Sequence, residues 1–138
     1  AGREFPTPAV DFVGITNDLA TIKTQAIASG LYFAASGFQG YQIILKTDDT
    51  FDLYRVTSLS APPSGCSDVT SDSTWGTWSI GAKTFLANYV VPANGLVFGE
   101  DNLWVEGQLN TARATIAAAR FPDTVATRKN ITINNDLK

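Results

Sequence analysis

This chain of 138 residues carries 13 acidic and 10 basic side chains, a net charge of −3, and 44% hydrophobic residues. Its length fits one domain with a core of its own, and its scattered cations do not form the basic surface that nucleic acid binding requires. Histidine is absent and cysteine occurs once, which excludes zinc clusters, Cys-His pairs and Ser-His-Asp triads.

Composition divides the single domain expected over residues 1–138 into four parts. These are an extended arm (1–15), a helix with a β-meander (16–57), a loop (58–73) and a β-rich part (74–138). Pro6 and Pro8 predict the arm, because proline blocks both a helix and a central strand. No apolar run reaches the roughly 18 residues that cross a bilayer, so membrane contact is expected only through a missing anchor or a partner. A processed product and an excised domain both stay open as origins of the chain.

A helix is expected over residues 17–29, where apolar residues recur at helical spacing. Thr16 or Asn17 can cap its start, and Gly30 can end it. The apolar residues fall at steps of three and four, which places them on one face that packs on a sheet. They are Ile15, Leu19, Ile22 and Ala26.

Three strands joined as an antiparallel meander are expected next, at 31–36, 41–46 and 51–57. Residues 47–50 are predicted to form the hairpin connection between the last two strands. In the third strand the apolar Phe51, Leu53 and Val56 are separated by polar residues. This pattern predicts that one face covers the helix and the other meets water.

Residues 58–73 are rich in Ser, Pro, Gly and Asp and show no periodicity, which predicts an exposed loop. Cys66 lies in this loop and is interpreted as an inert structural thiol, with a bridge to another chain as the alternative. A strand is expected over residues 74–80. Trp75 and Trp78 belong to this polar stretch, and they are the predicted contact surface.

The rest of the chain has short apolar runs closed by polar or glycine corners, which predicts a winding sheet. After a strand at 84–91, the expected strands are 96–98, 103–105, 114–116 and 131–133. Their spacing is too irregular for a strict solenoid repeat. Trp104 is expected to anchor the core of this part, with Leu103 and Val105 on the other face of its strand and both faces covered.

These patterns together predict an α+β fold that is mostly β. One N-terminal helix is expected to pack on an antiparallel sheet, and short winding, coil-like strands are expected to follow it.

Three carboxylates near residue 100 form one candidate site. Glu100, Asp101 and Glu106 have the chemistry of a glycosidase acid and base, but the turn-favouring residues at 99–102 favour a solvated corner. A sugar-stacking platform is a further interpretation of the aromatic residues, which are Trp75, Trp78, Trp104, Tyr32, Tyr41, Tyr54 and Tyr89. For Trp104, burial or a subunit contact is favoured over sugar stacking.

A second group of carboxylates has the oxygen chemistry that calcium prefers. Asp48, Asp49 and Asp52 lack the glycine and terminal glutamate of the twelve-residue calcium loop, so the hairpin tip is the favoured interpretation. The sequence therefore predicts no catalytic residues, no metal site and no cofactor.

Two stretches resemble pilus proteins. The segment DLATIKTQAIASG followed by LYFAASGFQGYQIILKTDDTFDLYRV resembles the soluble part of type IV pilin-like and pseudopilin-like proteins, where the first helix packs on an antiparallel sheet. The stretch VPANGLVFGEDNLWVEGQLNTARATIAAARFPDTVATRKNITINNDL resembles the β-rich region of PilX-like pilus assembly proteins. Pilins also carry a long apolar N-terminal helix with a processing site, which this sequence lacks, so the resemblance implies an exported domain without its anchor.

The function expected from this resemblance is a non-enzymatic, extracellular or cell-surface domain of a pilus or pseudopilus-type filament. It would act through contacts with other protein subunits, in a homo- or hetero-oligomer, either as a filament subunit or as an assembly factor. The alternative is a carbohydrate-binding or carbohydrate-cleaving surface module that uses Glu100, Asp101, Glu106 and the tryptophans.

Overall fold

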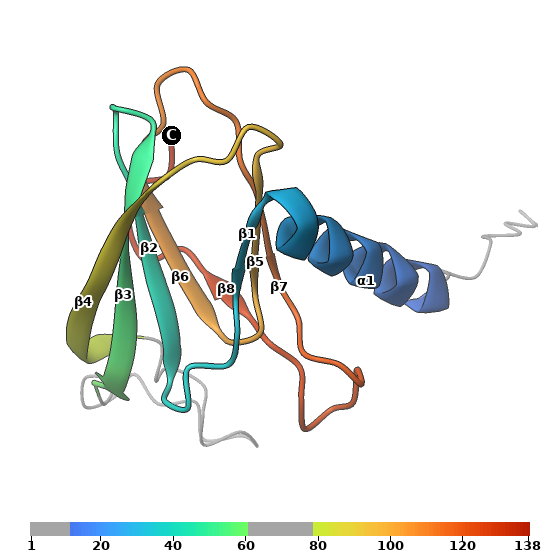
Figure 1. Cartoon of the computed structure of the whole chain (residues 1–138). Helices are drawn as coiled ribbons and strands as arrows, with labels where there is room; N and C mark the ends of the chain where they lie inside the picture. Colours follow the sequence, from blue (N-terminus) through green and yellow to red (C-terminus); the bar gives the residue numbers. More distant parts are fainter. Residues whose placement is uncertain (1–11, 61–78) are drawn as a thin grey trace, which may run out of the picture.

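The computed structural model describes residues 12–60 and 79–138 (Figure 1). Within these ranges the chain forms one helix, α1 (Phe12–Ser29), and eight strands in two sheets. The strands are β1 (Leu31–Phe33), β2 (Gly40–Leu45), β3 (Thr50–Leu59), β4 (Ile80–Val90), β5 (Leu96–Gly99), β6 (Leu103–Gly107), β7 (Thr115–Ala118) and β8 (Ile131–Thr132). The predicted α+β class, mostly β with an N-terminal helix, is confirmed. Cys66, Trp75, Trp78, most of the predicted arm and most of the predicted loop lie outside the described residues.

The two sheets differ in size and in strand direction. The small sheet has the order β1-β5-β7, and both of its pairings are parallel. The large sheet has the order β4-β3-β2-β6-β8, in which β2, β3 and β4 pair antiparallel while β6 and β8 add in parallel to β2.

The chain passes from the small sheet to the large sheet three times, and we call each strand-corner-strand pass a coil. The first coil is β1 and β2, the second is β5 and β6, and the third is β7 and β8 (Figure 1). The hairpin partner strands β3 and β4 intervene between the first two coils and extend the large sheet beyond β2. The four short strands expected from the sequence thus alternate between the two sheets, which accounts for their irregular spacing.

Helix α1 packs on the outer face of the small sheet, and the expectation that it packs on an antiparallel sheet is wrong. Ala26, on the helix, is buried against Phe98 of β5 and Ala117 of β7. The reason lies at Gly30, where a Cβ atom would lie 2.6 Å from the backbone oxygen of Leu96. This close approach fixes the end of α1 beside β5, so the helix covers the sheet to which β5 belongs. Among the described residues, no helix has the length and apolar character needed to cross a membrane.

The start of α1 was predicted too late, whereas its end was predicted correctly. The helix begins at Phe12, so residues 12–15 are helical rather than part of an extended arm. Pro6 and Pro8 precede this point, and no proline within 12–16 stops a helix from starting earlier than Thr16. At the other end, the backbone N–H of Gly30 donates to the carbonyl of Ala26 at 3.0 Å, and the helix ends at Ser29.

The main core lies between the two sheets. Phe33 of the small sheet meets Phe51 edge-on, with ring centroids 6.4 Å apart, and meets Tyr89 at 5.4 Å. The predicted hairpin between β2 and β3 is confirmed, but β1 does not join their meander. Strand β1 is apolar throughout, so its residues do not indicate which sheet it joins, and pairing with the distant β5 decides it. The buried face of β3 therefore covers the inside of the small sheet and not the helix.

Candidate interaction surface

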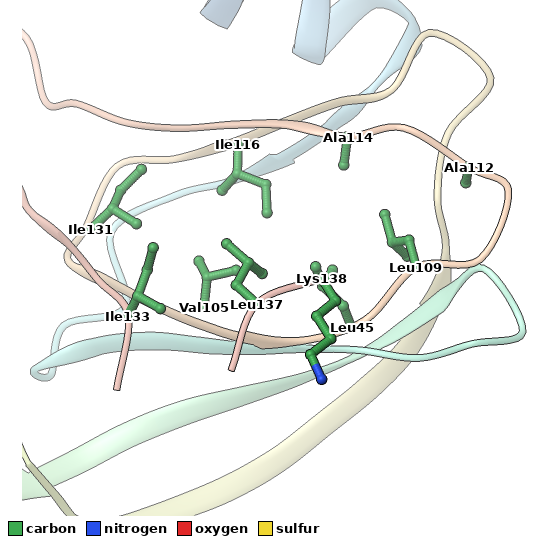
Figure 2. Close-up of a pocket in the computed structure, with 10 residues that line it drawn as sticks. All are labelled: Leu45, Val105, Leu109, Ala112, Ala114, Ile116, Ile131, Ile133, Leu137 and Lys138. Atoms are coloured by element: carbon green, nitrogen blue, oxygen red, sulfur yellow. The ribbon is translucent and has the colours of Figure 1, made fainter. Parts of the chain in front are cut away.

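An apolar groove of about 400 Å³ opens at the end of the stack of coils, between the two sheets (Figure 2). In Figure 2, Ile116 and Ala114 point from one wall toward Val105 and Leu137 on the other. Lys138 is the one charged lining residue, and its amine points away from Ile116. The full lining is Leu45, Val105, Leu109, Ala112, Ala114, Ile116, Ile131, Ile133, Leu137 and Lys138.

The groove is open because, in the described part of the chain, no further strand pairs with the outer edge of the third coil in either sheet. Strand β7 is the outermost strand of the small sheet, and β8 is the outermost strand of the large sheet. The side chains of Ile131, Ile133 and Leu137 are 44%, 57% and 45% exposed. In contrast, Leu103, which pairs with Ile131 from the preceding coil, is fully buried. Apolar side chains beside unpaired strand edges are typical of an interaction site.

Asp49 holds the connection between β6 and β7, which forms a further wall of the groove. Asp49 lies at the tip of the β2–β3 hairpin with a φ of 61°. Its carboxylate accepts hydrogen bonds from the backbone N–H groups of Asn110 and Thr111 at 2.8 and 2.9 Å, and from the Thr111 hydroxyl. The hydroxyl and then the backbone donors hold the pKa of Asp49 well below its usual range. The wall that carries Leu109 and Ala112 is thereby tied to the hairpin.

The opposite end of the large sheet has features that oppose pairing. Its outermost strand, β4, has three register shifts against β3. Such bulges in an edge strand disfavour the addition of another chain. Strand β4 also exposes Phe85, Leu86 and Val90, of which the Phe85 ring packs edge-on against Tyr54, with centroids 5.4 Å apart. The end at β7 and β8 is therefore the better candidate for a protein contact.

Glu100 is partly buried and is engaged by partners from two other elements. Its carboxylate pairs with Lys23 of α1 and accepts a hydrogen bond from Tyr32. Burial raises its pKa, but the hydrogen bonds from Lys23 and Tyr32 outweigh burial, and the net shift is downward. The pKa of Tyr32 is raised by burial and by its bond to Glu100. This ion pair fastens the helix to the corner of the second coil.

Asp101 is buried, with 4% of its surface exposed, so the prediction that residues 99–102 form a solvated corner is wrong. Its carboxylate accepts hydrogen bonds from the backbone N–H and the hydroxyl of Ser36, at 2.9 and 2.6 Å. Lys129 lies 3.4 Å from its other oxygen. The corner is buried because it is stacked between the corners of the first and third coils, a position that turn-favouring residue types do not reveal.

Glu106 and Trp104 lie on the outer face of the large sheet. The amide of Gln42 donates to Glu106 at 2.9 Å, and Lys83 donates to the Gln42 carbonyl at 2.6 Å. Trp104 is 2% exposed, and its strand neighbours Leu103 and Val105 are equally buried. The prediction that this triplet is covered on both faces is confirmed. Glu100, Asp101 and Glu106 each have a separate structural partner, and the structure does not bring them together around one cavity.

The hairpin carboxylates also have separate partners. Asp48 accepts a hydrogen bond from the hydroxyl of Thr50 at 2.6 Å, which lowers its pKa. Asp52 accepts one from the amide of Asn88 at 2.7 Å. These bonds lie within the hairpin and its neighbouring strand, as expected for a hairpin tip. No group of three or more metal-ligating side chains occurs among residues 12–60 and 79–138.

Comparison with family models, with curated proteins and with solved structures finds no match to this chain. The resemblance to pilin-like and PilX-like proteins therefore stays a hypothesis drawn from the sequence.

The groove residues are the ones that reading the sequence missed. Ile131 and Ile133 alternate with Thr132, which is the pattern of a strand with one apolar face. The pattern does not say whether another element covers that face. Leu109 and Ala112 lie in a connection without periodicity, so only their fold position identifies them.

Proposed function

We propose that this protein is a non-enzymatic structural domain that acts through protein–protein contacts, with the open end of its coils as the contact surface. The observation that carries the proposal is the exposure of Ile131, Ile133 and Leu137 around an apolar groove. Burial of apolar surface is the main driving force of protein association. A partner that covers these side chains would also pair the free edges of β7 and β8.

The setting proposed for this domain is the cell surface or the extracellular space, within a filament-type assembly. That part of the proposal rests on the resemblance to pilus components. Coils that stack along one axis are compatible with such an assembly, because one contact at the end of the stack prolongs the structure in one direction.

The contacts of the three candidate carboxylates favour this proposal over the carbohydrate-cleaving alternative. A glycosidase needs two carboxyl groups that face each other across the scissile bond. Glu100 pairs with Lys23 under the helix, whereas Glu106 accepts a hydrogen bond from Gln42 on the outer face of the large sheet.

Sedimentation velocity over a wide range of protein concentration tests the contact surface. The full chain is expected to associate as its concentration rises, because its open end is apolar and unpaired. The double variant Ile131→Asp with Ile133→Asp should remain monomeric, because a carboxylate in the contact must be desolvated. The matched control is Val125→Asp, since Val125 is 83% exposed and lies outside the groove.

Association of the double variant equal to that of the wild type would place the contact elsewhere and contradict the proposal. A second result also contradicts it. If the chain cleaves a glycan, and Glu100→Gln or Glu106→Gln abolishes the cleavage without changing the fold, the protein is an enzyme.

A further inference from the structure

We propose that the occupant of the open end is a fourth coil, a strand-corner-strand segment of a partner protein that stacks in parallel on β7 and β8. This inference rests on the proposed function and adds the chemistry and the orientation of the partner. It follows from three features of the described chain: its side-chain columns, its two free edges and the shape of the groove.

Inward-facing side chains form columns that run through successive coils. In the small sheet, Val97 of the second coil pairs with Ile116 of the third. In the large sheet, Leu103 pairs with Ile131. The second-coil members are covered on both sides and are 1% and 0% exposed, whereas Ile116 is only partly buried and Ile131 is 44% exposed. The second coil is stacked between two other coils, whereas the third coil is stacked on one side only.

The free edges select a strand pair over other occupants. Each sheet grows through these coils by parallel addition, with β7 beside β5 and β8 beside β6. A helix, an acyl chain or a small apolar ligand fills an apolar groove but pairs with neither the edge of β7 nor the edge of β8, which are the outermost strands. One coil supplies a strand to both edges at once and places apolar side chains in the groove.

The shape of the groove makes a second copy of this chain, related by a two-fold axis, a poorer fit than a partner coil, so self-association of the full chain should be weak and appear only at high concentration. Two copies related by a two-fold axis would bring one hollow against another, and their edge strands would meet antiparallel. A partner coil instead projects its inward side chains into the hollow. Its sequence should therefore have β-branched or leucine side chains at the positions opposite Ile116 and Ile131, and a small residue opposite Ala118, where the column of Phe33 and Gly99 continues.

A fusion of the full chain to a coil of known structure tests this inference. The sequence of residues 95–108, which contains the second coil, is appended after Lys138 through a flexible Gly/Ser linker that keeps its effective concentration high. The control fusion carries Val97→Ser, Leu103→Ser and Val105→Ser in the appended copy only. A second fusion appends residues 30–46, the first coil, in case one sequence docks poorly.

Amide hydrogen exchange at β7 and β8, melting temperature and sedimentation are measured on each fusion. At least one apolar fusion should slow exchange in both strands by about tenfold or more relative to the serine control, raise the melting temperature and abolish self-association. If neither does so, the inference is wrong. If self-association through Ile131 and Ile133 persists as a discrete dimer in the fusions, the occupant is a second copy, and the proposed function stands without this inference. Equal protection by an apolar dye would likewise overturn the coil as occupant.

Discussion

The carboxylate of Asp101 accepts two hydrogen bonds from Ser36, a residue 65 positions earlier in the chain. The first residue belongs to the corner of the second coil, and the second to the corner of the first coil. Lys129, from the corner region of the third coil, approaches the same carboxylate to 3.4 Å. One buried side chain thus joins three corners that are distant in sequence.

Replacement of this carboxylate should be costly. Asp101→Ala leaves the Ser36 donors and the partly buried Lys129 ammonium without their acceptor, and we expect a loss of about 2 to 4 kcal/mol in the free energy of unfolding. Urea denaturation with the midpoint and slope both fitted provides the measurement. Asp136→Ala is the control, because Asp136 is 84% exposed and should change stability by less than about 0.5 kcal/mol. Equal losses in the two variants would mean that Asp101 does not hold the corners together.

Trp104 should contribute more to stability than any aromatic residue exposed on the same face of the sheet. Trp104 pairs with Gln42, Gln42 with Tyr54, and Tyr54 with Phe85, so the row crosses four adjacent strands. Trp104→Ala is expected to cost about 3 to 5 kcal/mol, because its side chain is 2% exposed. Phe85→Ala, at a position 53% exposed in the same row, should cost about 1 kcal/mol or less.

Thermal melts of both variants, followed by circular dichroism, compare these costs. Similar melting temperatures, or a larger loss for Phe85→Ala, would contradict the placement of Trp104 in a buried layer.

Two glycines in the corner of the first coil allow the stability cost of a positive φ to be measured separately from the cost of a steric clash. Gly37 and Gly40 both have positive φ, at 72° and 139°. A Cβ at Gly40 would lie 2.1 Å from the backbone oxygen of Asn102, whereas a Cβ at Gly37 has no atom within 4 Å. Gly37→Ala should therefore cost about 1 kcal/mol from the backbone alone.

Gly40→Ala adds a clash with the second coil and should cost at least about 3 kcal/mol or prevent folding. Chemical denaturation of the two variants side by side measures the difference. A Gly40→Ala protein as stable as Gly37→Ala would show that the two corners do not approach as closely as described.

Asp49 should make the fold sensitive to acid. Its pKa is lowered in the folded state by the Thr111 hydroxyl and the backbone donors, whereas an unfolded aspartate titrates near about 3.9. The unfolded state therefore takes up protons first, so the stability that this carboxylate contributes is present above about pH 5 and is lost as the pH falls through and below about 4. We expect Asp49→Asn to lose less stability than the wild type over this window, because asparagine keeps an acceptor and tolerates the positive φ.

The measurement is the free energy of unfolding against pH for wild type, Asp49→Asn and the control Asp136→Asn. The control should follow the wild-type curve, since Asp136 is largely exposed. The pKa of Glu100 is also lowered in the folded state, so the stability of all three proteins should still fall somewhat as the pH is lowered. Superimposable curves for wild type and Asp49→Asn would show that the Asp49 carboxylate does not stabilise the connection between β6 and β7.

Local signals located most of the elements but few of the contacts between them. Gly30 marks the end of the helix and residues 47–50 mark the hairpin, because each signal acts within a few residues. The strand at 31–36 was expected in the meander, yet β1 pairs with β5. The glycine and carboxylate signals at 99–102 identified a corner, but its burial depends on Ser36 and Lys129, which no local pattern connects to Asp101.

By itself, the sequence determined the α+β class, the helix end, the hairpin, the alternation of apolar runs and the burial of Trp104, because these depend on backbone preferences and on side chains a few residues apart. Only the tertiary structure decided that successive short strands belong to two different sheets, that α1 covers the smaller one, and that the apolar faces of Ile131 and Ile133 remain uncovered. The physical reason is that parallel pairing joins residues far apart in the chain. Such pairing depends on which edges are free once the other strands are in place, and a repeating pattern of apolar residues is the same for a covered coil as for an open one.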